Sequence, residues 1–138
     1  MNNERLSENF TLDEFTRSDV AIKLGIINEP GEKEIEALRV LVNRTIQPLR
    51  DNLGIPIHIN SGYRCPELNK AVGGVPTSQH QKGEAADLSI DGKANNILDA
   101  LENNDIPFDQ AILYRKQNFL HVSLKLDGVQ RSNVIIKM

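Results

Sequence analysis

The spacing of apolar residues predicts one long amphipathic helix over residues 32–53. Apolar residues recur there every three or four positions, which places them along one helix face. They are Ile35, Leu38, Val42, Ile46, Leu49 and Leu53. Glu32, Glu34 and Glu36 occupy the first turn, where the helix dipole favours negative charge. Pro48 lies inside the pattern and has no backbone N–H, so we expect it to kink the helix or split it in two.

Shorter elements are predicted before this helix. Residues 1–9 are polar, and we expect a flexible N-terminus there. Thr11 and Glu14 have the spacing of a capping box, which predicts the start of a short helix. Ser18 and Asp19 then cap a second short turn over residues 20–24, which Gly25 can close.

The second half of the chain alternates between strands and helices. Strands are predicted over residues 56–60, 85–90, 108–114, 119–125 and 134–137, and helices over residues 66–72 and 93–103. A hairpin should pair Tyr114 with Phe119 and Ile112 with His121, which puts Gln110 and Tyr114 on the same face as His121. Helices early, strands late and short connections indicate an α+β fold with an antiparallel sheet.

Composition bounds the class of protein. The chain has 138 residues, which fits a single domain over residues 10–138. Hydrophobic residues make up 39%, and no apolar run approaches the ~20 residues of a membrane span. The net charge is -3 without a basic block, so we expect no binding to nucleic acid or membranes. Trp is absent and aromatics make up 4%, which argues against a stacking platform for sugars or bases.

Two further features concern the cellular context. Cys65 is the only cysteine, so no disulfide can form within the chain. The cysteine count therefore does not determine the cellular compartment. We interpret Cys65 as a helix-start residue in preference to a reactive thiol. Residues 1–8 contain no apolar segment of the kind found in secretory signal peptides, so we expect the chain to be cytoplasmic at synthesis.

Two histidines and an aspartate form a candidate metal site. His80 and Asp87 are seven residues apart, Gly83 between them lets the chain bend back, and His121 lies on a later predicted strand. Zinc in catalytic sites is commonly held by three side chains, with the fourth position left for water. Taken alone, the spacing leaves a second interpretation open, because a strand histidine is more often a hydrogen-bonded core residue than a ligand.

The order of these residues and their neighbours resembles the zinc D-Ala-D-Ala carboxypeptidase family. The group that contains this family also includes lysostaphin-type peptidases and the hedgehog signalling domain. The similarity covers nearly the whole chain and rests on Phe10-Thr11-Leu12-Asp13-Glu14-Phe15, Ser61-Gly62-Tyr63-Arg64, Pro66, Asn69, Gly73-Gly74, Ser78-x-His80-x-x-Gly83-x-Ala85-x-Asp87 and His121-x-Ser123. It implies a hedgehog/DD-peptidase-like fold, with helices packed on a small antiparallel sheet that carries Zn²⁺ held by His80, Asp87 and His121.

The resemblance also implies a reaction, the hydrolysis of a peptide bond in a peptidoglycan peptide of the bacterial cell wall. Zinc held in this way lowers the pKa of its water towards ~7 and polarises the scissile carbonyl. The resemblance leaves open whether the enzyme is a carboxypeptidase or an endopeptidase. We expect a monomer, which would act on the cell wall if a phage or lysis route delivers it there.

Four further side chains are assigned places around this site. Arg64 ends a strand near the loop of residues 78–83 that carries His80, which we call the metal loop. A planar guanidinium at this place suits the carboxylate or carbonyl of a substrate. Ser78 and Ser123 are candidates for orienting the ligands, and both are equally credible as plain loop and strand hydroxyls. His58 is interpreted as a core or edge imidazole, because three ligands already fill a catalytic zinc shell.

The general base is the missing part of the pattern. Members of the resembled family often carry a carboxylate three residues before the second histidine, and this chain has Asn118 there. Asn118 can at most position a water, since an amide cannot accept and return a proton. Glu84 is the nearest carboxylate of the motif, although a solvated side chain is the favoured interpretation, and hairpin alternation turns Asp109 away from His121. We therefore expect a metal-loaded but weak hydrolase.

Two hypotheses from other classes stand beside this one. The first is a catalytically weak or inactive zinc-binding module that recognises wall peptides or a protein partner. The second is a structural component of a phage particle without any metal. Metal content separates the second from the rest, and release of new amino groups from peptidoglycan separates the enzyme from the binding module.

Overall fold

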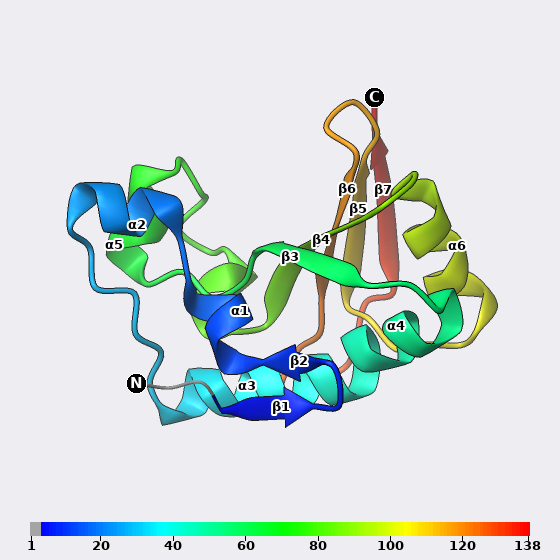
Figure 1. Cartoon of the computed structure of the whole chain (residues 1–138), viewed down its shortest axis with the longest axis horizontal. Helices are drawn as coiled ribbons and strands as arrows, with labels where there is room; N and C mark the ends of the chain where they lie inside the picture. The colour runs from blue at the N-terminus through cyan, green and yellow to red at the C-terminus, as the bar shows by residue number, and fades with distance from the viewer. Residues whose placement is uncertain (1–3) are drawn as a thin grey trace.

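The computed structural model of the chain describes residues 4–138, and a mixed five-stranded sheet forms its centre (Figure 1). The strands are β3 (Ile57–Ser61), β4 (Ala85–Ile90), β5 (Gln110–Tyr114), β6 (Phe119–Ser123) and β7 (Asn133–Lys137), in the order β3-β4-β6-β5-β7. The later helices are α5 (Pro66–Ala71), the 3-10 helix η2 (Gln79–Lys82) and α6 (Asn95–Asn103). The α+β class predicted from the sequence is confirmed.

The predicted hairpin is present with the predicted register. Tyr114 pairs with Phe119 and Ile112 pairs with His121 in the antiparallel pair of β5 and β6. The pairs β3–β4, β4–β6 and β6–β5 are all antiparallel, as expected. β7 differs, because it runs parallel to β5. β6 is already paired on both sides, so the next strand takes the free edge of β5, and the sheet becomes mixed.

The N-terminal segment is ordered where the sequence predicted flexibility. Residues 1–3 lie outside the described part, but β1 (Arg5–Ser7) pairs with β2 (Phe10–Thr11). Leu6 is buried, and the Asn43 amide donates to its carbonyl oxygen, so burial and hydrogen bonding hold the strand. Leu6 is the one apolar residue of β1, so the hydrophobic pattern there was too weak to predict a strand.

The two short helices follow the predicted capping. α1 (Leu12–Thr16) begins with the capping box, in which the backbone N–H of Thr11 donates to the Glu14 carboxylate. α2 (Asp19–Leu24) begins after Ser18, whose hydroxyl accepts from the backbone N–H of Ala21.

The long predicted helix is split, as Pro48 indicated. It consists of α3 (Glu32–Leu41), a π-helical segment η1 (Val42–Ile46) and α4 (Gln47–Leu53). Pro48 has no backbone N–H to donate to the preceding turn. In the π-helical segment just before it, each hydrogen-bonded turn contains one more residue than in an α-helix. Gln47 accordingly donates to the carbonyl of Val42, five residues back.

The two faces of the sheet have different environments. One face packs on the helices through buried side chains that alternate along the strands: Ile57, Ile59, Ala86, Leu88, Ala111, Leu113, Leu120 and Val122. Asp87, Ile112 and His121 alternate with these residues and point to the opposite face, which we call the open face. Among residues 4–138, no helix combines the length and apolar character needed to cross a membrane.

Candidate metal centre

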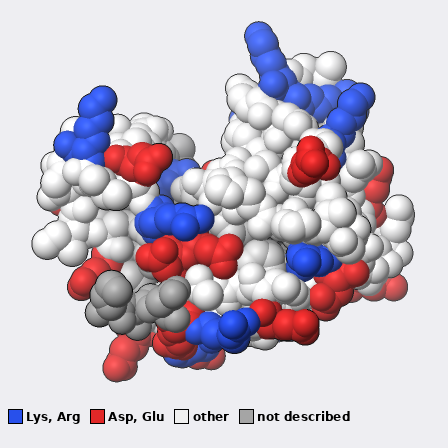
Figure 2. Space-filling model, viewed as in Figure 1, with Lys and Arg blue, Asp and Glu red and all other residues white. Residues whose placement is uncertain are grey.

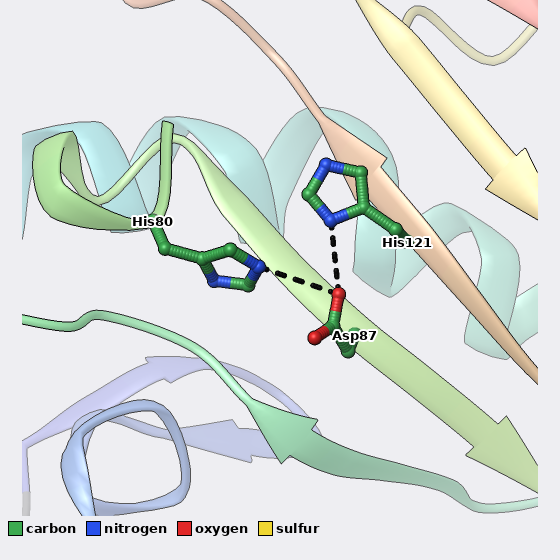
Figure 3. Close-up of side chains that lie close together, drawn as sticks. All are labelled: His80, Asp87 and His121. Atoms are coloured by element: carbon green, nitrogen blue, oxygen red, sulfur yellow. Dashed lines mark hydrogen bonds and ion pairs between the residues drawn. The ribbon is translucent and has the colours of Figure 1, made fainter. Parts of the chain in front are cut away.

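Three predicted ligands meet on the open face of the sheet. His80 comes from η2, Asp87 from β4 and His121 from β6, and β4 and β6 place Asp87 and His121 directly opposite each other. One ligand atom of each residue lies within 4.8 Å of the others. Figure 3 shows both imidazoles turned toward the carboxylate between them. The fold thus brings together residues that are up to 41 positions apart (121 − 80).

One oxygen of Asp87 connects the cluster. Its Oδ1 atom lies 2.9 Å from Nδ1 of His121 and 3.3 Å from Nε2 of His80. Asp87 and His80 are both buried, with 8% and 3% of their surfaces exposed. Burial alone would raise the pKa of Asp87, but the hydrogen bonds from His121 and His80 outweigh it and hold that pKa well below its usual range. The carboxylate is therefore ionised and able to bind a cation.

The partners of His80 favour a metal ligand. Its Nδ1 atom lies 2.7 Å from the carbonyl oxygen of Gly62, which can only accept, so Nδ1 donates to that oxygen and Nε2 is the nitrogen that faces Asp87. Nε2 lies 3.3 Å from Oδ1 of Asp87. A metal cation placed between these two atoms would be bound by both. The donor set of two imidazoles and one carboxylate is one that zinc accepts.

Local sequence explains how the loop delivers His80. Ser78 caps η2, and its hydroxyl accepts from the backbone N–H of His80 at 3.2 Å. Gly83 ends η2 at φ +73°, a left-handed conformation that disfavours other residues. A Cβ atom there would lie 2.3 Å from the carbonyl oxygen of Glu34, so close packing also requires glycine. Ser78 thus contacts the backbone of a cluster residue, and the predicted bend at Gly83 is confirmed.

Arg64 lies beside the cluster. The fold places Nη2 of Arg64 3.6 Å from Oδ2 of Asp87. Burial lowers the pKa of the Arg64 guanidinium, and Asp87 opposes that shift. Arg64 also borders the cleft described below, so it is placed to contact both the cluster carboxylate and a substrate.

Glu84 is held by the protein instead of being free in solvent. Its Oε2 atom accepts from the backbone N–H of Leu126 at 3.1 Å, and its Oε1 atom accepts from the Gln79 amide at 3.3 Å. The favoured interpretation of a solvated side chain is therefore wrong. Glu84 lines the cleft and also links the metal loop to the segment after β6.

Ser123 does not reach the ligands. Its hydroxyl accepts from the backbone N–H of Gln110 at 3.1 Å, and its side chain is fully buried between β5 and β6. Of its two predicted roles, the structure shows the plain strand hydroxyl.

Asn118 is also outside the cluster, which corrects its predicted place near the water. Its Oδ1 atom accepts from the backbone N–H of Ala94, and its Nδ2 atom donates to the carbonyl of Gly92. Both ends of the amide therefore fasten the turn before α6. The backbone of Asn118 is left-handed, with φ +62°, a conformation that asparagine tolerates better than most residues.

The remaining candidates lie where they were expected. His58 is exposed on β3, an edge strand, and is not part of the cluster. Asp109 is fully buried and pairs with Arg131 at 2.8 Å, so it is not available as a base. Cys65 is the residue before α5.

Sequence reasoning missed two asparagines that position the residues around Arg64. Asn28 holds the backbone on both sides of Arg64, because its amide donates to the Tyr63 carbonyl and accepts from the Cys65 N–H. Asn69 is 2% exposed, and its Oδ1 atom accepts from Nη1 of Arg64 at 3.2 Å. The position of Asn69 in the family-like order was the only signal for it, and no sequence pattern singled out Asn28.

The cluster opens into a cleft of about 830 Å³. Its walls come from the loop before β4, from the open face, and from the segment between β6 and β7 that carries Lys125, Asp127 and Arg131. Tyr114 and Phe119 also line it, stacked with ring centroids 4.6 Å apart. Few aromatics argued against a stacking surface, yet the fold places two of them in the cleft.

Figure 2 shows basic and acidic side chains interspersed on the face drawn, which is hollowed between the lobe of α2 and α5 and the sheet.

Comparison with known proteins gives the family. A family model described as Peptidase M15 matches residues 8–123, well over half of the 138-residue chain. The chain belongs to the peptidase M15 family, which confirms the resemblance to the zinc D-Ala-D-Ala carboxypeptidases and implies a metallopeptidase. The matched residues include all three members of the cluster. No curated protein matches the chain.

Proposed function

We propose that the protein is a zinc peptidase that hydrolyses a peptide bond in the peptidoglycan peptides of bacterial cell walls. The observation that carries the proposal is the convergence of His80, Asp87 and His121 at a cleft large enough for a peptide. Family membership supports the reaction class, and the substrate class rests on the family resemblance.

In this proposal the three cluster residues hold the metal. His80 contributes Nε2, because its Nδ1 atom is bonded to Gly62, and Asp87 and His121 contribute Oδ1 and Nδ1. Zinc bound there supplies a Lewis acid that activates water and polarises the scissile carbonyl. The carbonyl of Gly62 and the cap at Ser78 keep the His80 ring in place, since a ligand whose other ring nitrogen is bonded holds its orientation.

Arg64 is proposed to bind the substrate carbonyl or carboxylate. Its guanidinium borders the cleft beside Asp87, and 17% of the side chain is exposed. A planar fork of donors in a partly buried site binds a carboxylate in a bidentate manner. Asp87 would keep one edge of the fork occupied while the rest faces the cleft.

The general base is the weakest part of the site, which supports a slow enzyme. The cleft is lined by three carboxylates, Glu84, Asp87 and Asp127. Asp87 belongs to the cluster, Glu84 already accepts two hydrogen bonds from the protein, and Asp127 is exposed on the segment after β6. A positioned base contributes ~10²–10⁴-fold to such reactions. The same observation favours a second candidate function, a zinc-binding module that recognises wall peptides without cleaving them.

Digestion of purified peptidoglycan separates these functions. The protein, loaded with zinc, is incubated with peptidoglycan, and new amino groups are counted with an amine reagent against a sample stripped of metal. Zinc-dependent release supports the peptidase, and mass spectrometry of the released peptides identifies the bond. Tight zinc binding and retention on peptidoglycan without any release would favour the binding module.

A further inference from the structure

Arg64 stands at the boundary of two cavities. Besides the cleft with the metal cluster, it borders a side cavity of about 500 Å³ on β3, bounded also by the start of α2 and by α5. His58 and Tyr63 line only the side cavity, whereas His80 and Asp87 line only the cleft. Arg64 can serve the reaction only if its guanidinium is held toward the cleft.

Three groups hold the guanidinium, one at each nitrogen. Nε donates to the Ser61 hydroxyl at 3.2 Å, Nη1 donates to Oδ1 of Asn69 at 3.2 Å, and Nη2 lies 3.6 Å from Asp87. Ser61 is half-buried, while Asn69 is almost fully buried. Asn69 therefore contributes the one fully enclosed neutral acceptor of the set.

The orientation of the Asn69 amide is fixed from its other end. Its Nδ2 atom donates to the carbonyl oxygen of Val75 at 2.9 Å, so Oδ1 must face Arg64. A flipped amide would place its NH₂ group against the Arg64 donors and its oxygen against a carbonyl oxygen. The loop after α5 thus fixes which end of the Asn69 amide faces Arg64.

Gly74 provides the space that this amide needs. A Cβ atom at Gly74 would lie 2.1 Å from Oδ1 of Asn69 and 3.1 Å from Nη1 of Arg64. The backbone of Gly74 is not left-handed, so close approach is the reason for glycine here. The adjacent Gly73 is the reverse case, with φ +78° and no atom within 4 Å of a Cβ.

We propose that Asn69, packed against Gly74, is a positioning residue that holds the Arg64 guanidinium toward the cleft with the metal cluster. Asn69 acts through Arg64, because it is not a member of the cluster and does not itself line the cleft. The kinetic part of this inference rests on the proposed function, because it assumes that Arg64 binds the substrate. The structural part does not, and it is measured separately.

The structural test follows the Arg64 side chain by NMR. The Nε–H signal of Arg64 is identified by its absence in Arg64→Lys and compared in Asn69→Ala and Asn69→Asp, with no peptide present. Both Asn69 variants lose the bond to Val75, but Asn69→Asp still presents a carboxylate oxygen to Nη1. We expect the signal to shift and broaden in Asn69→Ala and to stay sharp in Asn69→Asp. An unchanged signal in Asn69→Ala, or equal loss in both variants, overturns the proposal.

A matched glycine pair tests the same arrangement without removing a hydrogen-bonding group. Gly74→Ala should displace the Asn69 amide and move the Arg64 signal, because its Cβ overlaps Oδ1. Gly73→Ala should lower the melting temperature through its left-handed φ and leave the Arg64 signal in place. Circular dichroism shows whether each variant is folded. If Asn69→Ala is unfolded, the comparison of Gly74→Ala with Gly73→Ala tests the proposal in its place. An Arg64 signal that changes equally in both glycine variants contradicts the proposal.

The kinetic test separates positioning from general damage. With a synthetic wall pentapeptide as substrate, Asn69→Ala should raise KM by about tenfold, the size of one lost hydrogen bond to a charged group, with zinc content unchanged. Asn69→Asp should restore KM toward the wild-type value. The control Asn43→Ala removes an amide that donates to the Leu6 and Arg39 carbonyls and should leave KM unchanged. If the wild type cleaves no peptide, the proposed function fails, while the NMR result still decides the role of Asn69.

Discussion

The Nδ1 atom of His80 lies 2.7 Å from the carbonyl oxygen of Gly62, the residue two positions before Arg64. This bond fixes which nitrogen of His80 faces Asp87. It also ties the metal loop to the segment that carries Arg64, whose backbone N–H donates to the His80 carbonyl at 3.0 Å. The two segments exchange hydrogen bonds in both directions, so the loop that delivers a metal ligand and the residue proposed to bind substrate form one unit.

Loss of a cluster imidazole should remove the metal. We expect the wild type to bind about one Zn²⁺ per chain, and His121→Ala to lose most of it, because two remaining ligands hold zinc poorly. Elemental analysis after gel filtration measures the content. His58→Ala is the matched control, since His58 is exposed on β3 outside the cluster and should retain zinc. Stoichiometric zinc in His121→Ala would contradict the assignment.

Arg64→Lys should reduce turnover while zinc stays bound. Lysine keeps the charge but loses the planar fork, so we expect turnover to fall at least about tenfold. Turnover on a wall peptide and zinc content are measured on the same preparation. The contact between Arg64 and Asp87 makes the metal measurement informative, because loss of zinc would show that Arg64 mainly holds the ligand.

Much of the fold follows from local patterns. The structure confirms three predictions that depend only on residues close together in the sequence. They are the apolar stripe over residues 32–53, the capping box at Thr11 and the pairing of Ile112 with His121. The parallel placement of β7 was not predictable in this way, because it depends on which sheet edge is still free.

The site shows the same division between local and distant information. The three cluster residues were named from their order, and the fold brings them together. The expectations for Glu84 and Asn118 failed because their partners, Leu126 for one and Gly92 and Ala94 for the other, are 24 to 42 positions away. A hydrogen bond between residues so far apart in the chain produces no local sequence pattern from which it could be predicted.

Glu84 should prove mainly structural. Glu84→Gln keeps an acceptor for the Leu126 N–H, removes the charge and replaces the acceptor of the Gln79 bond with an NH₂ group. We expect hydrolysis to stay within about tenfold of wild type, well short of the ~10²–10⁴-fold of a lost general base. Glu84→Ala removes both hydrogen bonds and should lower the melting temperature. A loss of activity beyond about 10²-fold in a folded, zinc-loaded Glu84→Gln would instead make Glu84 the base.

A carboxylate at position 118 should not rescue the site. Asn118→Glu removes the bonds to Gly92 and Ala94 and places a less suitable residue at φ +62°. We therefore expect a lower melting temperature and no gain in hydrolysis. Asn118→Gly, which suits the backbone but also loses the amide, separates the two contributions to stability. Faster hydrolysis by Asn118→Glu would show that the side chain reaches the cleft and that the site lacked a base.

The ion pair between buried Asp109 and exposed Arg131 should make the stability of the fold depend on pH in the acid range. Asp109 is fully buried and accepts from both the backbone and the guanidinium of Arg131, at 2.8 Å each. Burial alone would raise the pKa of Asp109, but the bonds from Arg131 outweigh it and lower that pKa. A carboxyl whose folded pKa lies below its unfolded value of about 3.9 stabilises the fold above that value, and loses this stabilisation as the pH falls through the folded pKa.

Asp109→Asn should therefore cost about 2 kcal/mol at pH 7, the size of a hydrogen bond to a charged group. The difference between wild type and variant should shrink as the pH falls below about 4, because the wild-type carboxyl then becomes neutral as well. Urea unfolding of both proteins at matched pH values measures it, and taking the difference cancels the carboxylates that the two share. A difference that stays constant down to the lowest pH at which both proteins fold would mean that Asp109 acts as a neutral acceptor, and that its charge contributes nothing to the fold.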